Sequence, residues 1–519
     1  MIRKILPLLV LILPTGAQAE WQEASSRHFV VYSDDRPENV RAFTERLEKF
    51  DKAIRVFRMA PDDKRGPASR VTVFVVNDVD EIQRIAGRKS IAGFYDPRAS
   101  GSIAFTPRKS DSDAAAAGMT PQAILFHEYA HHWMLTNWAD AALPPWFVEG
   151  FAEFHATALF RGDGSVTFGA APMYRQYTGM RMNLLPARQL LLPDPGKLEG
   201  ASSDALYSRG WLLTHYLTFD PTRRGQLAKY IIAMNSGKAA EAASILGDPN
   251  TLDFKLNAYA KSRSLASVTM KASELPIGPI TVRPLGAGES AVMMARLAST
   301  SGVTKKTAPK VAELARQLAA PYPNDAAAQN VLAEAEFDAE NYTAAEAAAD
   351  RAIAADPKSI HALVYKSTAQ LAAAKKAKVT DPAVWQGARR WLLQANKIDP
   401  EDPYPLAEYY YSFGIADETP SKGAEAGMLY AYALAPYDPL VRLSAARILL
   451  QQNKPGEARA ALAPVAYSRE SGQSKYALKI LAALDQGGVA AALTGLKEKP
   501  DDENEDSDKG KGKDGDKGK

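Results

Sequence analysis

The sequence predicts an α+β domain followed by an all-α domain of helical repeats. Two observations predict this order. Short runs rich in β-branched and aromatic residues alternate with a helical pattern before residue 121, and Ala-rich helical units recur beyond residue 308. A chain of 519 residues, 46% of them hydrophobic, is long enough to bury about three cores. We divide it into a leader, a first domain, an intervening segment, a repeat domain and a tail, at residues 1–19, 20–274, 275–306, 307–496 and 497–519.

The leader is expected to be a cleaved signal peptide. Arg3 and Lys4 precede an apolar run at residues 5–13, and Ala17-Gln18-Ala19 has the small-x-small pattern after which a signal peptidase cuts. This run is too short to cross about 30 Å of hydrocarbon as a helix, and no later run approaches about 20 residues. We therefore expect an exported protein, periplasmic if the source is Gram-negative, that is not an integral membrane protein. An uncleaved anchor is the alternative.

Charge and composition exclude several classes of function. The 63 basic and 60 acidic residues leave a net charge of only +3, which gives no argument for nucleic-acid binding. The absence of cysteine excludes thiol catalysis, iron–sulfur clusters and Cys-based zinc sites. Any metal site must therefore be built from Asp, Glu and the seven histidines.

The first domain opens with predicted strands and one long helix. Residues 28–32 and 71–76 are predicted strands that flank a helix at about 38–57, and residues 101–105 are a third predicted strand. Residues 93–97, which contain Gly, Asp and Pro, are predicted as a turn.

The rest of the first domain, from residue 121 to about 270, is predicted to be mostly helical. Interruptions are expected at residues 143–145, where two prolines follow a Leu, and at the Gly-containing stretch 161–170. Residues 276–288, which contain Pro and Gly, are predicted as a linker or small β element that joins the two domains.

The second domain is predicted from recurring trios of small or apolar residues. Small residues seven apart let two antiparallel helices approach closely, and the Pro that follows each trio stops the helix. The Pro-to-Pro intervals of 43 and 36 residues are close to the tetratricopeptide period. The trios and their prolines are Ala345, Ala349 and Ala352 with Pro357; Ala388, Leu392 and Ala395 with Pro400; and Ala424, Met428 and Ala431 with Pro436.

Residues 307–484 therefore resemble a tetratricopeptide array, with a further degenerate unit at residues 456–462. The resemblance implies a protein partner or substrate bound on the helical repeats. A generic Ala-rich helical bundle is the alternative. The tail carries six acids between residues 501 and 508 and alternates Lys with Gly and Asp beyond residue 509, so it is predicted to be disordered and solubilising.

The chemistry of the chain is predicted at His127-Glu128-Tyr129-Ala130-His131. Thr120 and Pro121 are a good N-cap and first helical residue, so the pentad is expected on a helix. Residues four apart share a helix face, which points both imidazoles at one spot where two neutral nitrogens can hold Zn²⁺. Glu128 can then take a proton from a metal-bound water. Two core histidines beside a surface Glu128 are the alternative.

Glu149 is the candidate for the third ligand. It lies in Trp146-Phe147-Val148-Glu149-Gly150-Phe151-Ala152-Glu153, a second predicted helix that begins after Pro144-Pro145. The alternative for Glu149 is a carboxylate favoured by the helix dipole.

These two motifs resemble those of the gluzincins, the thermolysin and aminopeptidase-N branch of the zinc metallopeptidases. The resemblance covers about residues 25–270 and implies an α+β zincin-like catalytic domain. It implies zinc bound by His127, His131 and Glu149, with Glu128 as general base. Tyr207-Ser208-Arg209-Gly210 is similar to the family's Tyr-x-Lys-Gly segment, with Arg for Lys, and implies that Tyr207 stabilises the oxyanion.

One family segment is missing from this chain. No Gly-x-Met-Glu-Asn segment, which anchors a free amine in the aminopeptidases, precedes His127. Endopeptidase and exopeptidase specificity therefore both stay open. The predicted strand at residues 102–105 is the expected edge to which an extended peptide adds. Glu153 is expected to orient a ligand histidine, as an alternative to an exposed carboxylate.

The sequence as a whole predicts an exported zinc metallopeptidase, a hydrolase that cleaves peptide bonds of a peptide or protein substrate through a zinc-activated water. The repeats would bind that substrate or a partner protein. The alternative is a catalytically silent zinc domain with tetratricopeptide-like repeats that acts as an assembly or binding module. His132, His155 and His215 are expected to have structural roles.

Overall fold

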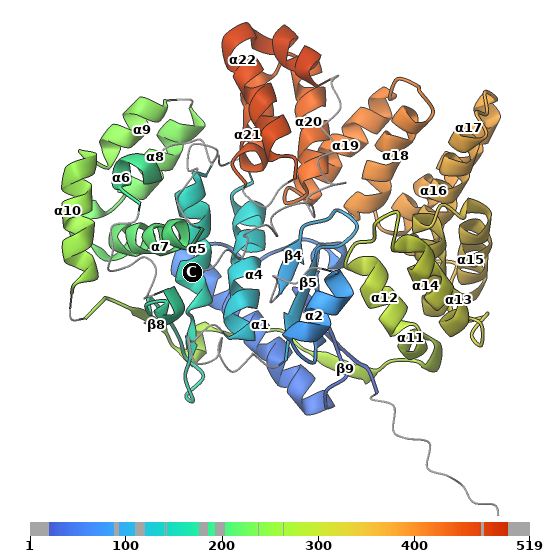
Figure 1. The fold of residues 1–519 in the computed structure, drawn as a ribbon, viewed down its shortest axis with the longest axis horizontal. Coiled ribbons are helices and arrows are strands. Elements are labelled where there is room, and N and C mark those ends of the chain that lie inside the picture. Colours follow the sequence, from blue (N-terminus) through green and yellow to red (C-terminus); the bar gives the residue numbers. More distant parts are fainter. Residues whose placement is uncertain are drawn as a thin grey trace, which may run out of the picture.

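The computed structural model of the protein describes residues 20–87, 93–108, 120–139, 141, 143–175, 185–191, 203–236, 238–262, 264–468 and 472–496. The predicted signal peptide at residues 1–19 and the predicted tail at residues 497–519 lie outside these ranges. Within them the chain is mixed α/β with a mainly helical C-terminal region (Figure 1), as the sequence predicts at this level.

The N-terminal part is built on a mixed six-stranded sheet. Its strand order is β4-β5-β3-β2-β1-β9. β2, β3 and β5 pair in parallel, whereas β1, β4 and β9 pair antiparallel with their neighbours. The strands are β1 (Gln22–Ser25), β2 (Phe29–Ser33), β3 (Val71–Val76), β4 (Phe94–Asp96), β5 (Ile103–Pro107) and β9 (Thr281–Pro284). β9 comes from the segment at residues 276–288 that was expected to be a linker or small β element, and it completes the sheet of the first domain.

Helices cover both faces of this sheet. Alternate residues of a strand point to opposite faces, so Val73 of β3 packs in one core and Phe74 in the other. The first core also holds α1 (Pro37–Arg58) and α4 (Pro121–Asn137). The second holds α2 (Val79–Ala86) and α12 (Met293–Thr300). A helix C-terminal to the first domain therefore forms part of its core.

The edge of the sheet differs from the prediction. Residues 93–97 were predicted as a turn, but β4 forms there and pairs antiparallel with β5. The rings of Phe94 and Phe105, directly opposite in this register, stack with centroids 4.7 Å apart. This cross-strand aromatic pair outweighs the local turn residues. The expectation that residues 102–105 form the free edge is wrong, because β5 lies between β3 and β4, and β4 ends the strand order.

Two further helices complete the first domain around α4. α5 (Pro145–Ala156) packs against both α4 and α7 (Ser203–Phe219). A small sheet of β6 (Leu159–Phe160), β7 (Val166–Phe168) and β8 (Val268–Met270) lies beside them. Between β7 and β8 along the chain come α7 and then α8 (Gln226–Asn235), α9 (Ala239–Ile245) and α10 (Pro249–Ala260).

The C-terminal region consists of consecutive helices that pack in pairs (Figure 1). The trios predicted from the sequence are buried on α15, α17 and α19, with no residue more than 2% exposed. α14, α16, α18 and α20 are each followed by a residue with a left-handed backbone, Glu340, Lys378, Asp417 and Asn453. The same helix ending in four successive units is compatible with a helical repeat domain. The helices are α13 (Ala308–Ala319), α14 (Ala326–Asp338), α15 (Tyr342–Ala355), α16 (Ile360–Lys376), α17 (Pro382–Ile398), α18 (Pro403–Ile415), α19 (Lys422–Leu434), α20 (Pro439–Gln451), α21 (Pro455–Ala466) and α22 (Ser474–Gly495).

We expected no segment after the leader to be long and apolar enough to span a membrane, and α22 is an exception to this expectation. Among the residues that the structure describes, it alone has the length and composition to do so. It is bent at Gly488, where φ is +68°, and it packs against α20 and α21.

The crossing of α5 and α7 depends on two glycines. A Cβ atom on Gly150 would lie 2.3 Å from the carbonyl oxygen of Gly210, and one on Gly210 would lie 2.4 Å from the carbonyl oxygen of Trp146. Both contacts are with backbone, which cannot move aside as a flexible side chain would. Only glycine at both positions therefore allows the two helices to approach this closely.

We predict that Gly150→Ala lowers the free energy of unfolding by about 1 to 3 kcal/mol or more, because the added methyl forces α5 and α7 apart. Gly387→Ala in α17 is the matched control, since its Cβ meets no atom within 4 Å. It should stabilise the protein by about 0.5 to 1 kcal/mol through helix propensity. Urea unfolding of the two variants measures both changes, and equal stability of Gly150→Ala and wild type would contradict the proposed close contact.

Candidate metal centre

Two imidazoles of α4 converge on one point. Thr120 caps the helix by accepting a hydrogen bond from the Ala123 N–H at 3.1 Å, and Pro121 occupies the first turn. His127 and His131 lie one turn apart on this helix, with their Nε2 atoms 3.1 Å from each other. The helix start and the shared face are both as the sequence predicts.

Glu149 of α5 brings a carboxylate to the same point. Its Oε2 atom lies 3.5 Å from Nε2 of His127 and 3.6 Å from Nε2 of His131. The residue is 3% exposed, and Oε2 has no hydrogen-bond partner among the residues that the structure describes. A buried carboxylate oxygen without a donor is costly unless a cation satisfies it. The three side chains together could hold a metal ion.

The electrostatics of the group favour positive charge between these side chains. Burial disfavours the imidazolium form of His127, but the Glu149 and Glu153 carboxylates outweigh it and raise its pKa well above the usual value. The pKa of His131 is raised in the same way, against burial and mainly by Glu149. Burial would raise the pKa of Glu149, yet the two imidazoles hold it well below its usual range. Glu149 is therefore an ionised carboxylate in a buried site.

Glu153 contacts His127 on the side of the ring that faces away from Glu149. Its Oε1 atom lies 3.4 Å from Nδ1 of His127, the ring nitrogen opposite the one that faces Glu149. The Tyr174 hydroxyl donates a hydrogen bond of 2.9 Å to Oε2 of Glu153. When a metal ion takes the place of the Nε2 proton, a carboxylate at Nδ1 keeps the other proton on Nδ1 and so orients the ring as a ligand.

The two other predicted residues also reach this centre. Glu128 directly follows His127 on α4. Burial raises the pKa of Tyr95 on β4 well above its usual value, and the negative charge of Glu128 adds to this, as it does to the raised pKa of His127 and of His131. Tyr207 of α7 is half-buried, with its ring edge-on to that of His127 and the centroids 5.7 Å apart. The α5–α7 crossing at Gly150 thus positions Tyr207 beside the histidines.

Three other histidines of the first domain have structural partners, as expected. His132 forms a hydrogen bond of 2.6 Å with the Tyr95 hydroxyl. His155 bonds the Phe151 carbonyl within α5, and His215 bonds the Tyr259 hydroxyl. Burial lowers the pKa of all three, so they stay neutral at pH 7. Arg209, where the family motif has Lys, donates a 2.8 Å hydrogen bond to Asp253 and joins α7 to α10.

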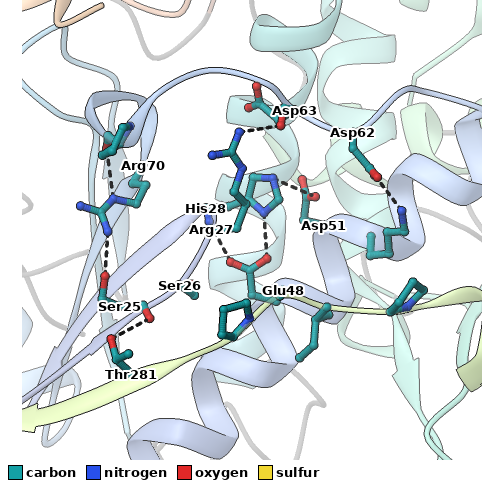
Figure 2. Close-up of a pocket in the computed structure, with 16 residues that line it drawn as sticks. Ser25, Ser26, Arg27, His28, Glu48, Asp51, Asp62, Asp63, Arg70 and Thr281 are labelled. Atoms are coloured by element: carbon teal, nitrogen blue, oxygen red, sulfur yellow. Dashed lines mark hydrogen bonds and ion pairs between the residues drawn. The ribbon is translucent and has the colours of Figure 1, made fainter. Parts of the chain in front are cut away.

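A buried polar cluster attaches α4 to α1. The Tyr129 hydroxyl donates a 2.8 Å hydrogen bond to Asp51, which also accepts one from Arg55. His28 lies beside them and bonds Glu48 at 2.8 Å (Figure 2). His28, Glu48 and Asp51 line a cavity of about 550 Å³. The three candidate metal ligands are not among the described residues that line it. The middle of the predicted pentad is therefore anchored from the side opposite the ligands.

Sequence reasoning missed two residues of the site. Tyr95 lies in the segment predicted as a turn, so no strand pattern pointed to it. Tyr174 lies in a short 3₁₀ helix, Met173–Arg175, with no spacing that relates it to Glu153. Both contacts depend on pairing between segments that are distant along the chain.

No model of a known protein family matches this chain, and no curated protein is significantly similar to it.

We predict that the protein binds one divalent metal ion per chain and that His131→Ala and Glu149→Ala each abolish stoichiometric binding. Isothermal titration with Zn²⁺ after treatment with a chelator measures this directly. His215→Ala is the control, because His215 is a buried histidine of the same domain that bonds Tyr259 instead. Its stoichiometry should equal that of wild type. Undiminished binding by His131→Ala would place the metal elsewhere.

Proposed function

We propose that this chain is an exported zinc-dependent metallopeptidase that hydrolyses peptide bonds. The observation that carries the proposal is the convergence of His127, His131 and Glu149, with a general-base candidate, Glu128, directly after His127 on α4. Tyr207 adds a phenol beside the ligands. Metal ligands alone fit many roles, whereas ligands with an adjacent carboxylate and a hydrogen-bond donor fit hydrolysis.

The spacing of the three donor atoms supports zinc as the metal. Ligands at 2.0 to 2.1 Å from a tetrahedral zinc ion lie about 3.3 to 3.4 Å apart. The three donor distances are 3.1, 3.5 and 3.6 Å. Two imidazole nitrogens and one carboxylate oxygen are also a ligand set of catalytic zinc sites, which keep the fourth position for water or substrate. The donor-free Oε2 atom of Glu149 has the chemistry that such an ion requires.

Each residue then has a distinct task. Zinc held by His127, His131 and Glu149 would supply Lewis acidity, which polarises the scissile carbonyl and lowers the pKa of water. Glu128 accepts the proton of the attacking water and delivers it to the leaving amine. Tyr207 donates a hydrogen bond to the oxyanion that develops on the carbonyl oxygen. Glu153 keeps His127 in the ligand tautomer.

The backbone of the substrate peptide is proposed to bind along the edge strand β4. It ends the strand order of the six-stranded sheet, and Tyr95 within it bonds His132, the residue after the second ligand. An extended peptide that adds to β4 by main-chain hydrogen bonds would therefore pass next to the metal group.

We predict that Glu128→Gln retains zinc and loses about 10² to 10⁴-fold in kcat/KM on a peptide library, because the neutral amide cannot accept the proton. His131→Ala should lose both zinc and activity. A chelator should abolish wild-type cleavage, and added zinc should restore it. Wild-type activity in zinc-loaded Glu128→Gln would contradict the mechanism.

Tyr207→Phe tests the oxyanion donor separately. We predict a loss of about 10² to 10³-fold in kcat with little change in zinc content. Tyr216→Phe is the matched control on the same helix, where the hydroxyl accepts a hydrogen bond from Arg223 instead. If zinc-loaded wild type cleaves no folded or unfolded protein, the silent assembly module becomes the better description.

A further inference from the structure

The hairpin formed by β4 and β5, residues 94–107, packs against the repeat helices with the loop at its tip. Between β4 and β5, Ala99 is 5% exposed and belongs to the same apolar cluster as Met428 of α19 and Val441 of α20. Its backbone N–H donates a 2.7 Å hydrogen bond to Oδ2 of Asp438, 339 residues away along the chain. The tip of the hairpin is therefore part of the repeat core.

The two carboxylate oxygens of Asp438 accept hydrogen bonds from different parts of the chain. It is the N-cap of α20, and its Oδ1 atom accepts hydrogen bonds from the N–H groups of Leu440 at 2.7 Å and Val441 at 3.0 Å. The other oxygen, Oδ2, holds Ala99. The cap and the hairpin contact use different atoms, so a substitution can separate them.

The same end of α20 also touches the metal-binding helix. The ring of Tyr437 lies 4.8 Å from that of His132, which bonds Tyr95 of β4. Arg442 donates a 2.7 Å hydrogen bond to the carbonyl of Ala139, two residues after α4 ends. The start of α20 therefore contacts both the loop that follows the edge strand, at Ala99, and the helix that carries the candidate ligands.

From these contacts we infer that Asp438 is a positioning residue, through which α20 holds β4 in the place where it aligns the substrate backbone. The inference rests on the proposed peptidase function. β4 has only three residues, and β5 is its one paired neighbour in the described part of the sheet. Such a strand orders poorly by itself, and an edge that moves cannot bind a peptide in a fixed register. The repeat domain thus serves the active site directly.

Asp438→Ser tests the inference and Asp402→Ser is its matched control. Serine is a good N-cap, so both variants keep their helix start, but a serine hydroxyl has no second oxygen for Ala99. Asp402 caps α18 in the preceding unit by accepting a 2.9 Å hydrogen bond from the N–H of Tyr404, which belongs to α18 and not to the hairpin. The two variants therefore differ in the hairpin contact and share the loss of a capping carboxylate.

Hydrogen exchange and kinetics give independent readouts. We expect amides of residues 93–108 to exchange about tenfold faster in Asp438→Ser than in wild type or Asp402→Ser. We also expect KM for an extended peptide to rise about five- to tenfold, with zinc content unchanged and kcat reduced less than twofold. The exchange experiment needs no substrate. An inactive wild type would therefore contradict the proposed peptidase function, whereas the amide exchange rates of residues 93–108 would still test the contact between Asp438 and the hairpin.

Two results would overturn the inference. Equal exchange in Asp438→Ser and Asp402→Ser would show that Asp438 does not hold the hairpin. Faster exchange in Asp438→Ser with an unchanged KM would show that the hairpin is held but that its position does not control peptide binding.

Discussion

The contact between α5 and α7 at Gly150 and Gly210 is the constraint on which the candidate site depends. Backbone meets backbone there, with no space for a Cβ atom on either residue. Glu149 precedes one of these glycines, and Tyr207 lies one turn before the other on α7. The crossing therefore fixes the distance between a metal-ligand candidate and a phenol that come from helices about 60 residues apart. A wider crossing would separate them even if every side chain of the site were retained.

The candidate metal centre also contains buried negative charge, which positions its side chains at a cost in stability. Glu149 and Glu153 both lie at most 3% exposed on α5, next to the imidazoles of α4. Buried carboxylates cost free energy unless they are paired, and the imidazole Nε2 atoms lie 3.5 and 3.6 Å from Oε2 of Glu149. A bound cation would relieve this cost, so the pattern fits a functional site better than a purely structural ion-pair network.

The parts of the site that the sequence predicted are local ones. The N-cap at Thr120 and the shared helix face of His127 and His131 follow from helix geometry alone, and the trios of the repeat helices follow from spacing. The edge strand β4 was missed because a stacked pair of Phe94 and Phe105 from two strands decides it. The bond from Ala99 to Asp438 has no local signal at all. Non-local contacts of this kind also decide the role of residues 275–306, which were expected to be a linker or small β element but contain α12, a helix packed on the sheet.

The pentad on α4 shows how one short motif meets several constraints at once. Successive residues of a helix point about 100° apart, so five residues reach every side of α4. His127 and His131 point to Glu149, and Glu128 lies near Tyr95 on the edge strand. Tyr129 bonds Asp51 on α1, and Ala130 is fully buried in the first core. The two middle positions, which a zinc motif leaves open, are therefore fixed here by packing. They hold the helix in the orientation that directs its other residues toward the metal group and the edge strand.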